Sequence, residues 1–97
     1  MRYIAMFEDT GPMAEVRRQI EPAHLGYLTQ HRDEIKMAGG LRDVPGGAYV
    51  GGLWVFEVAS RERAVALIEA DPYFQVHPRP YRLHVWGKAL PQFDVVM

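Results

Sequence analysis

Four segments of the chain carry the alternation of side chains and the aromatic and β-branched residues that are typical of strands. These strands are expected at residues 2–8, near Leu41, at residues 49–58 and at residues 81–90. Apolar residues at helical spacing predict helices at residues 13 to about 36, with an interruption at Pro22, and at residues 61–70. The order β-α-β-β-α-β predicts a ferredoxin-like α+β fold, in which an antiparallel sheet carries two helices on one face.

The first helical segment is expected in two pieces, because Pro22 disrupts a helix interior but is tolerated in a first turn. The second piece is predicted to run from Pro22 to about Lys36, and Gly39-Gly40 to end it before a short strand. One side of this piece carries His24, Leu28, His31 and Ile35.

The second helix has clear sequence signals at both ends. Ser60 occupies the N-cap position, where its hydroxyl can accept a free backbone N–H of the first turn. Pro72 closes the segment and biases Asp71 away from helical geometry, and residues 75–80 are expected to be irregular. A carboxylate therefore lies just past a helix end and is followed by two aromatic residues, Tyr73 and Phe74.

The strand at residues 49–58 is apolar on both faces, with Leu53 and Val55 opposing Trp54 and Phe56. Two helices cover only one face, and a solvated second face would alternate apolar with polar residues. A second copy packed face to face would cover it, so a two-fold homodimer is expected. The chain is interpreted as one domain, residues 1–97, whose tail at 91–97 is a candidate edge strand or partner contact.

Composition narrows the possible functions. The 97 residues are 48% hydrophobic and 24% charged, which is ordinary for a globular protein. A net charge of −1 gives no reason to expect a nucleic-acid partner. The chain has no cysteine, and its only serine is the predicted cap, so thiol chemistry is excluded and a Ser-His-Asp hydrolase is poorly supported. The weakly apolar run before Glu8 and Asp9 is too short for a signal peptide or membrane span, so a cytoplasmic protein without membrane contact is expected.

His24 and Asp71 are the first candidates for chemistry. Both helices lie on one face of the predicted sheet, so their ends can meet. The carboxylate would then accept the imidazole Nδ1–H and fix the tautomer, which makes a pair suited to general acid/base catalysis. The alternative is that His24 is a partly buried helix residue and Asp71 a local turn or cap residue. A separation of forty-seven positions forms no motif, so spacing alone leaves both open.

No metal or other cofactor is expected. His24 and His31 would lie about 10 Å apart along a helix, too far to share one metal ion. His77 and His84 show no metal-ligand spacing with a nearby acid. His84 shares a predicted strand face with Trp86, and it either lines a pocket or is an ordinary edge residue.

Arginine and aromatic residues supply candidates for ligand binding. Arg42, Arg79 and Arg82 could hold an anion through forked hydrogen bonds, or could be solvated on the surface. The aromatic residues that could line a cavity between sheet and helices, or instead form the core, are Trp54, Phe56, Tyr73, Tyr81 and Trp86.

Several stretches resemble the YCII-related (YciI-like) family, over about residues 1–89. They are the first strand, PAHLGYL at 22–28, AGGL at 38–41 and GGLWVFEVASRERAVALIEADPYF at 51–74. The resemblance implies a dimeric α+β barrel and an active site that pairs a helix histidine with the aspartate of an A-D-P-Y/F turn. By position these are His24 and Asp71. The segment FQVHPRP at 74–80 departs from the family in its proline and basic content.

The activity best described for this family is dehydrochlorination of a chlorinated hydroxyquinol. The expected function is therefore a cofactor-independent acid/base enzyme, of lyase, isomerase or dehydrochlorinase type, acting on a small aromatic or quinone-like molecule. The expected catalytic residues are His24 and Asp71. The expected ligand-binding residues are Tyr73, Phe74, Arg42, Trp54 and His84. The alternatives are a non-catalytic binding or accessory module that uses the same cavity, and cofactor-free oxygenation, which related barrels carry out.

Overall fold

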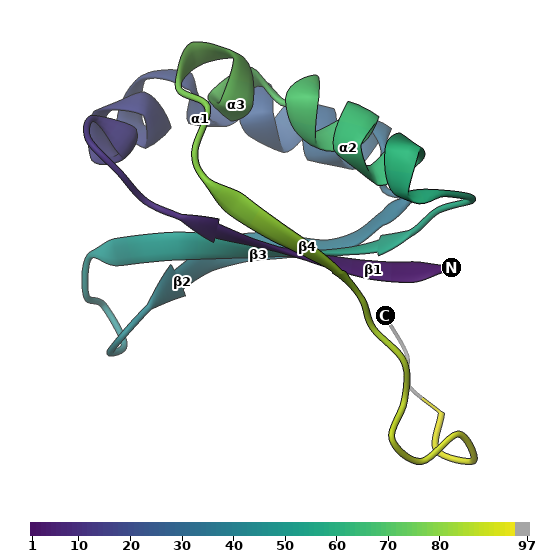
Figure 1. The fold of residues 1–97 in the computed structure, drawn as a ribbon. Helices are drawn as coiled ribbons and strands as arrows, with labels where there is room; N and C mark the ends of the chain where they lie inside the picture. The colour runs from purple at the N-terminus through teal and green to yellow at the C-terminus, as the bar shows by residue number, and fades with distance from the viewer. Residues whose placement is uncertain (95–97) are drawn as a thin grey trace.

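The computed structural model describes residues 1–94 as a four-stranded antiparallel sheet with three helices packed on one face (Figure 1). In chain order the elements are β1 (Arg2–Glu8), α1 (Met13–Gln30), β2 (Ile35–Arg42), β3 (Tyr49–Glu57), α2 (Arg61–Glu69), α3 (Pro72–Val76) and β4 (Tyr81–Val85). The strand order β2-β3-β1-β4 is the ferredoxin-like arrangement. The predicted fold class is confirmed, with α3 as an addition.

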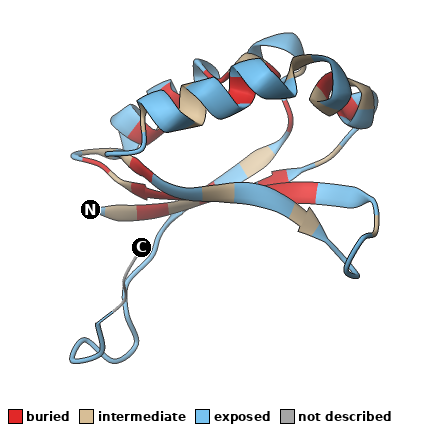
Figure 2. Cartoon of the chain, turned by 180° about the vertical axis from the view of Figure 1, so that it is seen from behind, coloured by how far each residue is buried: buried red, intermediate tan, exposed pale blue. Residues whose placement is uncertain are grey.

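The core lies between the sheet and the helices, where Figure 2 shows the buried segments facing each other. On the central strand β1, Tyr3, Ala5 and Phe7 are buried on this side, and Met6 on the other side is 47% exposed. β1 pairs with β3 on one flank and with β4 on the other, which places Ala5 between Trp54 and Leu83. The alternation along β1 therefore separates a packed face from an open one.

α1 bends at the predicted interruption. Ile20, two residues before Pro22, has non-helical backbone angles (φ −126°, ψ 17°) and joins two helical pieces. Proline lacks the backbone N–H that would continue the hydrogen-bond ladder, and its ring crowds the preceding turn. The restart at Pro22 changes the direction of the helix and so sets where His24 and the following residues meet the sheet.

The predicted end of this helix is wrong. α1 ends at Gln30, and Ile35 and Lys36 already belong to β2, which also contains Gly39 and Gly40. β2 pairs along its length with β3, and Ile35 is buried opposite Phe56. A bulge between Ile35 and Met37 interrupts the alternation of side chains, so the local pattern does not indicate a strand. Pairing across the sheet decides the structure here.

α2 begins as predicted, because the hydroxyl of Ser60 accepts a hydrogen bond of 3.1 Å from the backbone N–H of Arg63. The stop at Pro72 is only partly right. Pro72 ends α2 but also begins α3, which includes Gln75 and Val76 in place of the irregular segment expected there. A proline in a first turn loses no hydrogen bond and has a preset φ, so one residue can end one helix and start another.

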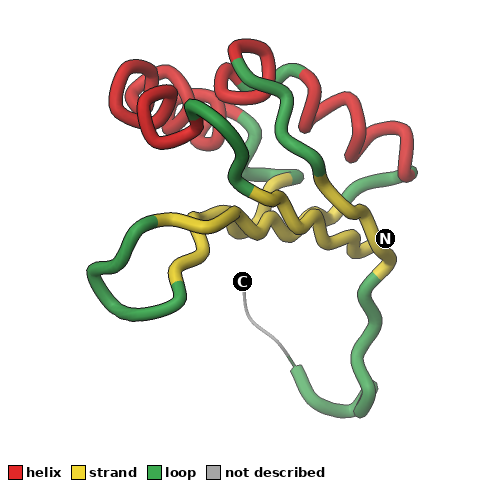
Figure 3. The backbone as a smooth tube through the Cα atoms, turned by 60° about the vertical axis from the view of Figure 1, so that its left-hand side comes forward, coloured by secondary structure: helices red, strands yellow, loops and turns green. Residues whose placement is uncertain are grey.

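β4 is shorter than the strand predicted for residues 81–90. The backbone N–H of Trp86 bonds to the carbonyl of Arg2, the first residue of β1, so later residues have no pairing partner there. After β4 the described chain runs away from the sheet on the side opposite the helices (Figure 3). A turn closed by Phe93 and Leu90 lies in the predicted tail, and residues 95–97 lie outside the described residues. No helix within residues 1–94 is long and apolar enough to cross a membrane.

Candidate functional site

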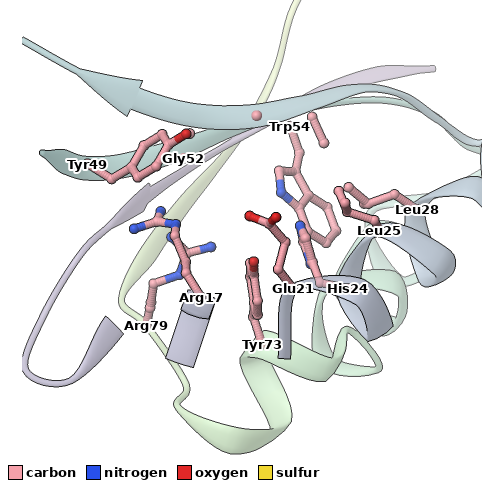
Figure 4. Close-up of a pocket in the computed structure, with 13 residues that line it drawn as sticks. Arg17, Glu21, His24, Leu25, Leu28, Tyr49, Gly52, Trp54, Tyr73 and Arg79 are labelled. Carbon is pink, nitrogen blue, oxygen red and sulfur yellow. The ribbon is translucent and has the colours of Figure 1, made fainter. Parts of the chain in front are cut away.

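A cavity of about 210 Å³ lies between α1, α3 and the helix-facing side of the sheet (Figure 4). α1 contributes Arg17, Glu21 and His24 to its wall, β3 contributes Trp54, and the segment from α3 onward contributes Tyr73 and Arg79. Cavities that hold drug-sized ligands measure roughly 300–1,000 Å³, so this one suits a molecule of about one ring.

His24 lines this cavity and contacts Asp71, which is buried behind it. Nδ1 of His24 lies 2.6 Å from Oδ1 of Asp71, and the two residues are 8% and 2% exposed. Asp71 occupies the N-cap position of α3, yet its side chain makes no capping bond. The carboxylate therefore points to His24 instead of to the free backbone N–H groups of its own helix.

The imidazole of His24 is packed on one face as well as bonded at its edge. Tyr73 stacks on it with ring centroids 3.8 Å apart and planes 9° apart, and the centroid of Trp54 lies at 6.1 Å. A carboxylate can only accept, so the bond to Asp71 calls for a proton on Nδ1, and in the neutral form of such a ring Nε2 is the acceptor. Within the described residues every fully buried side-chain nitrogen has a hydrogen-bond partner. Nε2 of His24 has none, so it must keep some accessible surface, and His24 lines the cavity.

Tyr73 places a protonated hydroxyl in the same cavity. The residue is 4% exposed, and burial, with the negative charge of Glu21 next in effect, raises the pKa of its hydroxyl to about 12. The hydroxyl therefore stays an O–H donor at neutral pH and is not available as a base. It can donate a hydrogen bond to an oxygen of a bound molecule beside the imidazole.

An arginine pair lies at the other side of the cavity. Arg17 makes a forked ion pair with Asp9 and also donates to the carbonyl of Gly51 at 3.1 Å. Arg79 donates from Nη1 to Oδ1 of Asp9 at 2.8 Å. Burial of Asp9 opposes ionisation, but the hydrogen bonds from both arginines outweigh it and hold the pKa of the carboxyl below its ordinary value. Asp9 is therefore a fixed negative charge between two positive ones.

The predicted ligand-binding residues divide into two groups. Trp54 and Tyr73 line the cavity together with His24. Phe74 instead packs against the core cluster, with its ring 5.9 Å from that of Tyr81. Arg42 ends β2 and stacks on Tyr49 outside the cavity wall, while His84 belongs to a separate hollow beside Arg82, near Met6 of the open sheet face.

Sequence reasoning did not select Arg17, Glu21 or Asp9. The signal for two of them is present, because Arg17, Glu21 and His24 are spaced by four and three residues and so share one helix face. The bend at Ile20 makes that spacing hard to read across the two helical pieces. Asp9 follows β1 and has no local signal, since its role comes from contacts with Arg17 in the next helix and with Arg79 near the other end of the chain. Residues 1–94 contain no group of three side chains that could hold a metal ion.

The fold and the cavity define a class of protein: a small ferredoxin-like α+β protein with a buried histidine–carboxylate pair beside a ring-sized cavity. The model of the YCII-related domain matches residues 1–80, and the chain belongs to this family.

Two solved structures extend the comparison. The chain is similar in structure to 5-chloro-2-hydroxyhydroquinone dehydrochlorinase (TftG) from Burkholderia phenoliruptrix AC1100, in complex with 2,5-dihydroxybenzoquinone. The TM-score is 0.78 at 21% sequence identity, over 90% of this chain and 94% of the other. It is more remotely similar to an uncharacterized NIPSNAP domain protein from Burkholderia xenovorans, with TM-score 0.46 and 15% identity over 94% and 98% of the two chains. No curated protein sequence matches this chain. The likeness to TftG supports the α+β fold.

Proposed function

We propose that the protein is a cofactor-independent acid/base enzyme of the lyase or dehydrochlorinase type, acting on a small aromatic or quinone-like molecule. The observation that carries the proposal is the 2.6 Å bond between the buried Asp71 and His24, which lines a ring-sized cavity. Support also comes from TftG, a dehydrochlorinase with the same fold. His24 would be the catalytic residue, and Asp71 a positioning residue that acts through the imidazole.

In the proposed reaction, Nε2 of His24 removes a proton from the substrate, and the electron pair so released forms a new π bond. Chloride leaves with the electron pair of the broken C–Cl bond, and the imidazolium returns its proton to water. The net change is loss of HCl without oxidation or reduction. Asp71 would stabilise the imidazolium and keep Nδ1 as the donor, so that the base faces the substrate. The Tyr73 O–H would hydrogen-bond an oxygen of the ring.

The test is chloride release from a panel of chlorinated hydroquinones and hydroxyquinols. We expect the wild type to release chloride and Asp71→Asn to do so at least about tenfold more slowly, because an amide can donate to Nδ1 and reverse the tautomer. Nitrogen-15 NMR of His24 should show the Nδ1–H tautomer in the wild type only. Asp43→Asn makes the same change in an exposed loop and should leave both readouts unchanged.

Two results would contradict the proposal. Equal turnover in wild type and Asp71→Asn would show that the pair takes no part in the reaction. Tight binding of the ring compounds with no chloride release by the wild type would favour a non-catalytic binding module that uses the same cavity.

We also propose that the protein acts as a homodimer that buries the open face of the sheet. On that face Met6 and Met37 are 47% and 65% exposed, and Trp86 just beyond β4 is 46% exposed. These side chains suit the apolar centre of an interface between two copies. Light scattering on a size-exclusion column should give twice the 11.1 kDa of one chain, and a mass of one chain would refute the dimer.

A further inference from the structure

We propose that Arg17 and Arg79 form a subsite that holds an ionised oxygen of the ligand, so that the protein prefers a small ring carrying a phenolate or enolate over its neutral form. This inference rests on the proposed function and deepens it, because the subsite and His24 line the same cavity. Figure 4 shows the two arginines along one side of the cavity and His24 with Trp54 along the other.

The two guanidinium groups are held in place before any ligand arrives. Asp9 bonds both of them, and the carbonyl of Gly51 bonds Arg17. Aromatic faces support them as well: Arg17 lies 4.4 Å from the ring centroid of Tyr49, and Arg79 lies 4.7 Å from that of Phe7. An arginine that is already ordered loses little conformational freedom when it binds an anion, so a larger part of the interaction free energy contributes to binding.

Arg79 keeps unused donors toward the cavity. It is 5% exposed, and only its Nη1 bonds a described residue, the carboxylate of Asp9. Because residues 1–94 contain no fully buried side-chain nitrogen without a partner, the other nitrogen atoms of Arg79 keep some accessible surface, and the residue lines the cavity. The absence of a side chain at Gly52 keeps this space open, since a Cβ there would lie 3.5 Å from Nη1 of Arg79.

The charges around the cavity leave one positive charge uncompensated at this side. Arg17 and Arg79 together carry two positive charges against the single carboxylate of Asp9. The carboxylate of Asp71 lies on the opposite side, bonded to His24, and its negative charge also acts on Tyr73. Glu21 is the opposing charge: it is exposed at the rim and close enough to raise the pKa of Tyr73. An ionised oxygen would therefore be attracted to the arginine side and repelled by Glu21 and by the Asp71 side of the cavity.

An oxygen bound by the arginines would also orient the ligand. Since the arginines and His24 line opposite sides of a ring-sized cavity, a ring held by its ionised oxygen presents its far side to the imidazole. A neutral ring lacks this anchor. The subsite would thus select the ionised form of the ligand and set which ring atom faces the base.

The probe is 4-nitrophenol, which ionises near neutral pH and whose phenolate absorbs visible light, compared with its methyl ether 4-nitroanisole, which cannot ionise. We expect the wild type to bind the phenolate at least about tenfold more tightly than the ether, as for a charge-assisted hydrogen bond. The same preference lowers the apparent pKa of the bound phenol. Arg79→Gln should remove most of this preference without changing the affinity for the ether.

Two further variants are compared with Arg79→Gln: one is expected to leave phenolate binding unchanged and the other to strengthen it. Arg82→Gln makes the same change at an exposed position of β4, outside the cavity wall, and should bind the phenolate as the wild type does. Glu21→Gln removes the opposing charge from an exposed position and should strengthen phenolate binding several-fold. If Arg79→Gln fails to fold by circular dichroism, the wild-type comparison and Glu21→Gln still test the subsite.

Equal affinity of the wild type for the phenolate and the ether would overturn the subsite, as would no phenolate binding at millimolar concentration. Equal losses of phenolate affinity in Arg79→Gln and Arg82→Gln would mean that the overall charge of the protein causes the preference, and they would also overturn the subsite. The experiment measures binding alone, so its failure is distinct from that of the proposed function. Chloride release that depends on Asp71 would stand without the subsite, and the phenolate preference would stand without chloride release.

Discussion

His24→Gln is expected to lower the rate of chloride release by a factor of roughly 10²–10⁴, the usual contribution of a general acid/base group. Glutamine has similar reach and polarity but cannot take up a proton near neutral pH. Because the imidazole is the group that bonds Asp71 and opens to the cavity, its loss removes the base while the other cavity residues remain. The measurement is kcat and KM of the wild type and variant on the same chlorinated substrate.

The loss should appear in kcat more than in KM, because His24 would act on the transferring proton and not on ground-state binding. His84→Gln is the matched control, since His84 belongs to a separate hollow. Comparable activity in His24→Gln and the wild type would rule out the imidazole as the base. A rise in KM alone, with kcat unchanged, would indicate a binding role for the same side chain.

Trp54→Ala is expected to lower the free energy of unfolding by about 3–5 kcal/mol, the range for removal of a buried large aromatic side chain. Trp54 is 2% exposed and lies at the centre of the core, with its ring centroid 5.2 Å from that of Phe7 and 5.8 Å from that of Phe56. Domains of this size are stable by only about 5–15 kcal/mol, so the variant would be close to unfolding. Urea unfolding followed by far-UV circular dichroism measures the change.

The second tryptophan of the chain provides the control. Trp86 is 46% exposed just beyond β4, so Trp86→Ala should change the stability of a single subunit by less than about 1 kcal/mol. Each variant keeps one tryptophan, so fluorescence can follow both transitions. Equal losses at both positions would contradict the assignment of Trp54 as the central core residue. A loss at Trp86 that grows with protein concentration would instead support the proposed dimer.

The sequence and the structure agree best where local chemistry decides the backbone. β1, β3 and the start of α2 follow from side-chain alternation and from the cap at Ser60, and all three are present as predicted. The disruption at Pro22 is likewise a property of one residue and its neighbours. These features need no information about the rest of the chain.

The sequence-based prediction and the structure disagree where pairing with a distant segment determines the backbone structure. Residues 35–40 read as the end of a helix, but they form β2 because β3 is available to pair with them. β4 stops at Val85 because β1 begins at Arg2 and offers no further partner. Hydrogen bonds between strands depend on which segments the fold brings together, and local propensity carries little of that information.

The candidate site divides in the same way. The sequence by itself determined the fold class and the family resemblance, and it predicted His24 and Asp71 as a candidate pair through that resemblance, because a separation of forty-seven positions forms no motif. Only the tertiary structure decided that they touch, that Phe74 and Arg42 lie outside the cavity wall and His84 in a separate hollow, and that Arg17 and Arg79 share Asp9. The physical reason is that a cavity is made by side chains from four elements, and their distances depend on packing that no single segment encodes.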